Sequence, residues 1–217
     1  MGVITMHDFR YVSKSEYKPL KNQIIELLYD VQDEVRSYFT FRFDFIGSTK
    51  RNMITQDIKS NIGFDFDVNI EVNDDDEDYT ATDIRNKLRN AITKVSRNYG
   101  FTKCEDSTRV ITIKKANRWY STIEHSCDFA VVYGSQYIRY NKGGQKYSWE
   151  SQSKGYINIE QRADTLKNDK NKKYWNEVRE VYIDKKNRNT NPDKHSRSIY
   201  AETINEVYKR YLNDKNN

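Results

Sequence analysis

The sequence contains little cysteine, proline, glycine or histidine. Its two cysteines, Cys104 and Cys127, are too few for a disulfide framework, so we expect reduced thiols in a cytoplasmic protein. The two prolines, together with frequent Lys and Asn, are typical of AT-rich microbial genomes. The few glycines form neither a P-loop nor a paired-glycine fingerprint. His125, Cys127 and Asp128 lie close in sequence, but neighbouring strand residues point to opposite faces, which disfavours zinc.

Long hydrophobic runs are also missing. No apolar stretch approaches the ~20 residues that span a bilayer, and the first residues lack the basic-then-apolar pattern of a signal peptide. Charged residues make up 32% of the chain and the mean hydropathy is -1.00. We therefore expect a soluble protein with no membrane partner.

Charge is unevenly distributed along the chain. Residues 74–78 form an acidic run, whereas residues 167–197 contain ten Lys or Arg against five Asp or Glu and so carry an excess equal to the whole net charge of +5. If acidic residues elsewhere in the chain bind a metal ion, a basic segment that faces them suits a polyanionic ligand that is itself bound to the metal. Two alternatives stay open: both segments are solvated surface, or the acidic run binds Ca²⁺ without the spacing of an EF-hand.

Two aspartates, Asp65 and Asp67, stand out in the run of residues 63–72. Read as a strand, this run places Phe64, Phe66, Val68, Ile70 and Val72 on one face and both carboxylates on the other. Paired carboxylates repel each other unless a cation or a proton intervenes. Hard divalent cations prefer such oxygen ligands. The pattern predicts a metal site, with an exposed edge-strand face as the alternative.

The remaining pattern predicts an α+β fold with a mixed sheet, flanking helices and a small C-terminal helical lobe. Pro19 suits the first position of a helix over residues 19–38, and Thr80 or Thr82 caps a second helix to about residue 99. Residues 49–62 read as polar and irregular. Further strands are predicted at residues 40–46, 108–114 and 127–133, with a hairpin at 136–149. We expect a core over 1–158 and a helical lobe over 159–217 that packs on it.

Three short segments together resemble the DNA polymerase-beta-like nucleotidyltransferase superfamily, in particular its bacterial branch related to cyclic-dinucleotide and oligoadenylate synthases. They are Phe45-Ile46-Gly47-Ser48, Phe64-Asp65-Phe66-Asp67-Val68 and Cys127-Asp128-Phe129-Ala130-Val131. The resemblance covers residues 40–135 closely and the C-terminal part loosely. The Asp-x-Asp pattern alone has little specificity; the Gly-Ser before it and the strand aspartate after it provide the specificity.

The resemblance implies roles for these residues. In that family the Gly-Ser pair, here Gly47 and Ser48, contacts the triphosphate. The paired aspartates, here Asp65 and Asp67, bind two Mg²⁺ ions, for which Mn²⁺ can substitute. The third aspartate, here Asp128, completes the metal site and helps activate the acceptor hydroxyl. Without the aspartates, Gly47-Ser48 would read as an ordinary turn.

The chain departs from the family pattern in two places. Sixteen residues separate Ser48 from Asp65, and the basic residues of this insertion, Arg51 among them, are candidates for phosphate contacts. The C-terminal lobe is short for a large acceptor groove. Within it, Tyr182 is a candidate for base stacking and Lys185 for phosphate binding, although a tyrosine in a helical stripe more often packs in the core.

The sequence therefore predicts a Mg²⁺-dependent enzyme that transfers a nucleoside monophosphate from an NTP, most readily ATP or GTP, to a hydroxyl and releases pyrophosphate. The acceptor stays open: a nucleotide, RNA, a protein or a small molecule. The resemblance implies a role in bacterial defence or signalling. The alternatives are a catalytically silent module of the same fold that binds nucleotides, or RNA through its basic lobe, and a structural protein ordered by calcium.

Overall fold

The computed structural model describes residues 7–74, 77–117, 119–152 and 157–216. Residues 75 and 76 of the acidic run and the first six residues lie outside this description. The chain divides into two compact units. The sheet unit comprises residues 12–56 and 61–152, and the helical unit comprises residues 1–11, 57–60 and 153–217.

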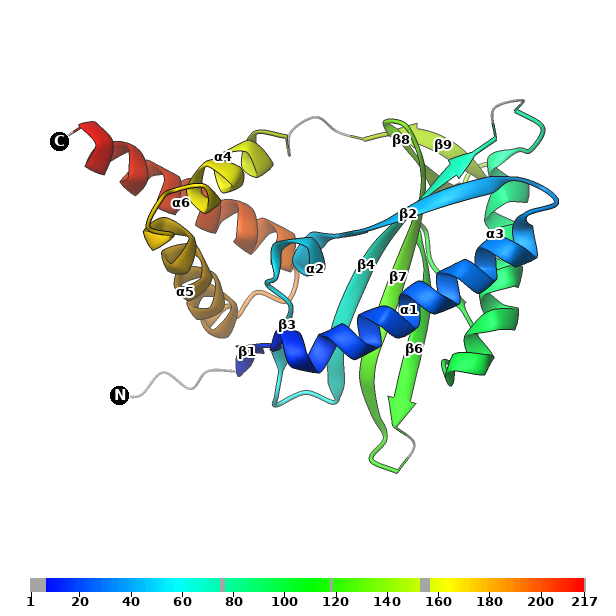
Figure 1. Cartoon of the computed structure of the whole chain (residues 1–217), viewed down its shortest axis with the longest axis horizontal. Helices are drawn as coiled ribbons and strands as arrows, with labels where there is room; N and C mark the ends of the chain where they lie inside the picture. Colours follow the sequence, from blue (N-terminus) through cyan, green and yellow to red (C-terminus); the bar gives the residue numbers. More distant parts are fainter. Residues whose placement is uncertain (1–6, 75–76, 118, 153–156, 217) are drawn as a thin grey trace. The chain divides into compact units, whose positions relative to one another are not determined.

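A mixed β-sheet forms the centre of the sheet unit (Figure 1). Its hydrogen-bonded strand order is β2–β4–β7–β6–β5, with β8 paired to the end of β7 and β9 paired to β8. The two central strands, β4 and β7, run parallel, and the other pairs run antiparallel. The predicted α+β class with a mixed sheet is confirmed. The strands are β2 (Thr40–Ile46), β4 (Ile62–Asn73), β5 (Glu105–Asp106), β6 (Val110–Asn117), β7 (Thr122–Tyr133), β8 (Gln136–Asn141) and β9 (Lys146–Ser151).

Alternation of side chains divides the sheet into an apolar and a polar face. On β4, Phe64, Phe66, Val68, Ile70 and Val72 are all buried, as the sequence pattern predicts. Cys127, Phe129 and Val131 continue the same face on β7, because they lie opposite Phe66, Val68 and Ile70 in the register. This face packs against two helices to form the hydrophobic core. The polar face carries the aspartates.

The two core helices, α1 (Lys14–Val35) and α3 (Ala81–Ser96), contact each other and cover the apolar face. The α1 stripe of Ile24, Leu27, Leu28, Val31 and Val35 is buried at helical spacing. Thr80 caps α3 through a capping box with Asp83. The 3₁₀ turn η1 (Arg97–Tyr99) follows α3 and extends the helical segment to the predicted end.

The predicted start of the first helix at Pro19 is wrong. The helix begins at Lys14, because Ser13 forms a capping box with Glu16 and so fixes an earlier first turn. Pro19 is the sixth residue of the helix and lies in its second turn. It leaves the carbonyl of Ser15 without the usual backbone donor at this point.

The irregular segment predicted at residues 49–62 is also partly wrong. It contains most of the short helix α2 (Gly47–Arg51) and strand β3 (Thr55–Asp57). Asn52 adopts a left-handed conformation that ends α2, and Met53 donates a backbone hydrogen bond to the Ser48 carbonyl at 2.9 Å. Met53 and Ile54 are each only 1% exposed. Two apolar residues within a polar segment therefore anchor it.

The helical unit consists of strand β1 (Phe9–Tyr11) and the helices α4 (Ile157–Lys167), α5 (Lys173–Arg188) and α6 (Ser196–Asn216). Tyr174, Val178 and Tyr182 on α5 and Tyr200, Ile204 and Val207 on α6 form its buried stripes. β1 is held to α5, because the Tyr11 hydroxyl donates to the Arg179 carbonyl at 2.7 Å and the Phe9 amide donates to Asn187 Oδ1 at 2.6 Å.

Candidate active site

The parallel pairing of β4 with β7 brings together the three aspartates that the sequence singles out. Asp67 lies opposite Asp128 in the register, and Asp65 lies opposite Ser126. Because opposite residues on neighbouring strands share a face, all three carboxylates project from the polar face of the sheet. Adjacent strands lie about 4.8 Å apart, so side chains more than sixty positions apart in sequence become neighbours.

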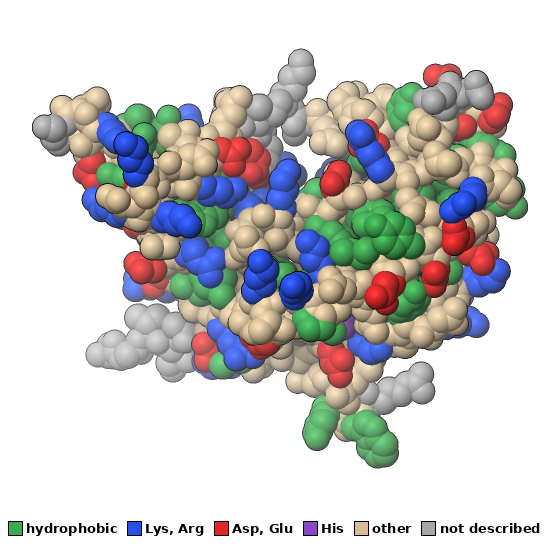
Figure 2. Space-filling view, in the orientation of Figure 1, with side chains coloured by type: hydrophobic (Ala, Val, Ile, Leu, Met, Phe, Trp, Pro, Cys, Tyr) green, Lys and Arg blue, Asp and Glu red, His purple; other side chains and the backbone are tan. Residues whose placement is uncertain are grey.

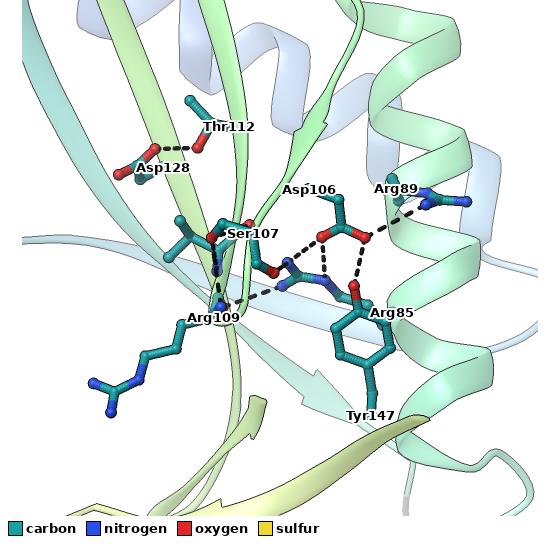
Figure 3. Close-up of polar contacts among 9 residues, drawn as sticks. Arg85, Arg89, Asp106, Ser107, Arg109, Thr112, Asp128 and Tyr147 are labelled. Atoms are coloured by element: carbon teal, nitrogen blue, oxygen red, sulfur yellow. Dashed lines mark hydrogen bonds and ion pairs between the residues drawn. The ribbon is translucent and has the colours of Figure 1, made fainter. Parts of the chain in front are cut away.

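Each end of this carboxylate group is hydrogen-bonded to a hydroxyl. The Ser126 hydroxyl donates to Asp65 Oδ1. The Thr112 hydroxyl, on β6, donates to Asp128 Oδ1 at 2.5 Å (Figure 3). Sequence reasoning missed both hydroxyls. The signal was available, because Thr112 and Ser126 occupy polar-face positions on strands whose alternate residues are Ile111, Ile113 and Cys127.

Burial and mutual repulsion disfavour simultaneous ionisation of the neighbouring carboxylates. Burial, followed by repulsion from Asp128 and Asp65, raises the pKa of Asp67 to about 6, and the Arg51 guanidinium opposes this rise. Burial also raises the pKa of Asp128, while the Thr112 hydrogen bond lowers it and Asp65 raises it. A proton or a cation at this position relieves the repulsion. The electrostatics of the polar face therefore favour a positively charged ligand.

Gly47 lies directly against Asp67. Its φ of +59° is a left-handed conformation that favours glycine, and a Cβ atom added to it would lie 2.4 Å from Asp67 Oδ2. The strand register explains the contact, because Ile46 at the end of β2 is paired with Asp67. The Gly47-Ser48 turn thus borders the carboxylates.

Arg51 belongs to the same corner of the sheet unit. It is the last residue of α2 and is half-buried, and its charge acts on Asp67. Thr49, two residues earlier in α2, is buried with its hydroxyl lacking a hydrogen-bond partner among the described residues. The basic residue that sequence reasoning assigned to phosphate is therefore electrostatically coupled to an aspartate assigned to metal.

Tyr182 and Lys185 lie on α5 of the helical unit and have partners within it. The Tyr182 residue is 5% exposed and its ring packs edge-on against Tyr200. Lys185 Nζ forms an ion pair with Glu206 at 2.6 Å. A buried ring presents no face to a base, so we do not include Tyr182 in the proposed site.

Other basic side chains of the helical unit are also paired with acidic ones. Ion pairs join Arg188 to Asp184 and Lys194 to Glu202, and further pairs join Lys173 to Asp214 and Arg210 to Glu177. Figure 2 shows basic and acidic side chains side by side over this part of the chain. Local pairing offsets much of the excess positive charge seen in the sequence, so the structure gives no support for RNA contact.

A buried ion pair braces the strand that carries Thr112. Arg85 on α3 is completely buried, and its guanidinium donates to Asp106 Oδ1 on β5 at 2.5 Å and to the carbonyls of Arg109 and Ser107 (Figure 3). The Tyr147 hydroxyl on β9 donates to Asp106 Oδ2 at 2.6 Å. The turn between β5 and β6 is thus fixed to α3 and β9 by a fully buried cation and its partners.

The donor chemistry of the polar face fits a hard divalent cation. Asp65, Asp67 and Asp128 supply only carboxylate oxygens, the ligand type that Mg²⁺ and Mn²⁺ prefer. Burial and the neighbouring carboxylates raise the pKa of Asp67 despite the opposing Arg51 charge. Among the described residues, no three His, Cys, Asp or Glu side chains are close enough together to form a metal-binding cluster. One oxygen of Asp65 and one of Asp128, Oδ1 in each case, accept hydrogen bonds from Ser126 and Thr112.

No protein-family model and no curated protein matches the sequence. Solved structures do match. The GTP-bound form of Vibrio cholerae DncV is 19% identical, with a TM-score of 0.56 over 91% of this chain and 52% of that one. The CdnE c-di-GMP synthase from Capnocytophaga granulosa is 16% identical, with a TM-score of 0.58 over 94% of this chain and 63% of that one.

The chain has the fold of these cyclic-dinucleotide synthases. The resemblance predicted from Gly47-Ser48 and the three aspartates is thereby confirmed at the level of the fold. The chain spans between about half and two thirds of the length of the synthases it matches. Among the described residues, no helix has the length and apolar character needed to cross a bilayer.

Proposed function

We propose that this chain is a metal-dependent nucleotidyltransferase that moves a nucleoside monophosphate from an NTP to a hydroxyl acceptor. The observation that carries the proposal is the register of the two central strands. It places Asp67 opposite Asp128 on the polar face, with the Gly47 backbone against the Asp67 carboxylate. Carboxylates that can hold divalent cations, next to a turn whose backbone can approach a phosphate, suit nucleotidyl transfer.

In the proposed reaction, the acceptor oxygen forms a bond to the α-phosphorus, and the bond from that phosphorus to the bridging oxygen breaks. Pyrophosphate leaves with the bonding electrons. Asp128 receives the proton of the acceptor hydroxyl, a role suited to a carboxyl whose pKa burial raises. Gly47 and Ser48 hold the triphosphate through backbone amides and the Ser48 hydroxyl, and Arg51 offsets its charge. Bound Mg²⁺ or Mn²⁺ would neutralise charge on the phosphate oxygens.

The solved relatives suggest which acceptor to test first. One DncV structure is described as a cyclic AMP-GMP synthase in complex with the linear intermediate pppA(3′,5′)pG. A nucleotide hydroxyl is therefore the acceptor class that we propose, with ATP and GTP as donors and a signalling role, in bacterial defence for example, for the product.

The test is incubation of the chain with all four NTPs and Mg²⁺ or Mn²⁺, followed by pyrophosphate measurement and mass spectrometry of the products. We expect metal-dependent pyrophosphate release that falls at least 100-fold in Asp67→Asn and Asp65→Asn. Asp44→Asn is the matched control. Asp44 is an exposed aspartate on β2, opposite Asn69, and lies on the same polar face of the sheet as Asp65 and Asp67. Equal activity in the Asp44, Asp65 and Asp67 variants would contradict the proposal.

A catalytically silent nucleotide-binding module is the second candidate. It is favoured by the present side-chain arrangement, in which the described residues form no metal-binding cluster. The same preparation distinguishes the two. A module gains thermal stability from NTP and Mn²⁺ but releases no pyrophosphate, whereas the enzyme does both.

A further inference from the structure

Two strand hydroxyls contact the carboxylates of the candidate site, and each comes from the residue directly opposite in the register. Asp65 is paired with Ser126, whose hydroxyl donates to Asp65 Oδ1. Asp128 is paired with Thr112, whose hydroxyl donates to Asp128 Oδ1 at 2.5 Å. Among the described residues, these are the hydrogen bonds that the two carboxylates receive from side chains. Each carboxylate keeps its Oδ2 for another ligand.

We propose that Thr112 and Ser126 are positioning residues that fix the orientation of the Asp128 and Asp65 carboxylates for cation binding. The inference rests on the proposed function and adds two residues to it. A carboxylate rotates easily about its last side-chain bond, so one hydrogen bond to one oxygen selects the direction of the other. Both hydroxyls lie on strands that are hydrogen-bonded on both sides, and Ser126 is only 8% exposed.

The chemistry of the donors supports this role. A hydroxyl satisfies one carboxylate oxygen without neutralising the charge that attracts a cation, whereas a Lys or Arg in the same place would compete with the metal. Lys114 occupies the next polar-face position on β6, but its Nζ is paired with Glu105 at 2.5 Å. Neutral hydroxyls thus donate the hydrogen bonds to Asp65 and Asp128, while Lys114 pairs with Glu105 and affects Asp128 through its charge.

The position of Thr112 is itself constrained. β5 and β6 pair so that Asp106 lies opposite Ile111 and Glu105 lies opposite Thr112. Asp106 is the carboxylate bound by the buried Arg85 (Figure 3). Strand β6, which supplies the Thr112 hydroxyl, is therefore connected to α3 through its neighbour β5.

The test is Mn²⁺ affinity of the full chain, measured by electron paramagnetic resonance without nucleotide, so that its readout does not depend on turnover. Thr112→Val and Ser126→Ala remove each hydroxyl, and we expect each to weaken Mn²⁺ binding about 10–100-fold. Thr112→Ser and Ser126→Thr keep a hydroxyl and should restore most of the affinity. Should Thr112→Val unfold, Thr112→Ala carries the same test.

Ser96→Ala is the matched control. Ser96 is a fully buried serine on α3, on the other side of the sheet, whose hydroxyl bonds to the carbonyls of Thr93 and Thr102. We expect it to lower thermal stability and leave Mn²⁺ affinity unchanged. An equal loss of affinity in Ser96→Ala, or no rescue by the conservative variants, would overturn the positioning role.

The outcomes separate this inference from the proposed function. If Asp67→Asn abolishes Mn²⁺ binding while Thr112→Val and Ser126→Ala keep wild-type affinity, the positioning role is overturned and the nucleotidyltransferase proposal stands. If the wild type shows no aspartate-dependent Mn²⁺ binding, both are overturned.

Discussion

Replacing Gly47 by alanine tests the contact between the glycine turn and the aspartates. Two effects are expected. The first is conformational, because an alanine at φ +59° adopts the left-handed region at a cost of about 1 kcal/mol. The second is steric, because the new methyl group would lie 2.4 Å from Asp67 Oδ2. That oxygen is the end of a mobile side chain, so the carboxylate moves rather than the backbone.

Gly134 provides the control for the conformational effect. It has φ +56°, and a Cβ atom added to it has no neighbour within 4 Å. Gly134→Ala should therefore show the backbone cost alone. We expect both variants to lose about 1 kcal/mol, which corresponds to roughly 2–4 °C in Tm for a protein of this size.

The two variants should differ in metal binding and turnover. Displacement of the Asp67 carboxylate should lower Mn²⁺ affinity and pyrophosphate release at least 10-fold in Gly47→Ala, whereas Gly134→Ala should keep wild-type values. The assays are urea unfolding for stability, Mn²⁺ titration for affinity and pyrophosphate release for activity. Wild-type Mn²⁺ affinity in a folded Gly47→Ala protein would refute the reasoning, because it would show that Asp67 does not need the space that the glycine leaves.

Two further predictions concern stability. The pKa of His125, which Phe64, Phe66 and Phe101 surround, is lowered to about 4, first by burial and then by the Lys115 charge. Because the unfolded chain binds this proton near pH 6.5, the free energy of unfolding should fall by up to about 3 kcal/mol as the pH drops from 6.5 to 4. Urea unfolding at several pH values should show this fall in the wild type relative to His125→Phe. The same pH dependence of the unfolding free energy in both proteins would contradict the prediction. Asp106→Ala should lower the free energy of unfolding, measured in urea, by about 3–5 kcal/mol, because it leaves the buried Arg85 without its carboxylate. The surface control Asp33→Ala should change that free energy little, since its Arg36 partner is exposed. Equally small effects of both substitutions would show that the Arg85–Asp106 pair is dispensable for stability.

Alternation and helical periodicity were sufficient to predict the centre of the fold. Phe66 and Val68 face the core and Asp65 and Asp67 face away because a half-buried strand permits little else. Asp128 was assigned instead from a continuous apolar run predicted as a strand over residues 127–133, and the observed strand begins earlier, at Thr122. Local patterns of this kind are strong, so the elements that carry the candidate site could be predicted without coordinates.

Features that depend on partners distant in sequence could not be predicted in the same way. The start of the first helix is a different case, because the capping box of Ser13 and Glu16 is a local signal that the prediction from Pro19 overlooked. The hydroxyl contacts of Thr112 and Ser126 depend on which strands are neighbours and in which register, and a single sequence does not give that pairing. Tyr182 and Lys185 found partners within their own helical bundle that composition alone could not reveal.

The strand order also determines when the site can first exist during synthesis. Asp65 and Asp67 emerge from the ribosome about sixty residues before Asp128, and β7, the strand that inserts between β4 and β6, is the last of the three to be made. Until β7 has been synthesised, the growing chain contains Asp65 and Asp67 but not Asp128. A translation product that ends before β7 therefore lacks the parallel β4–β7 pair that brings the three aspartates together.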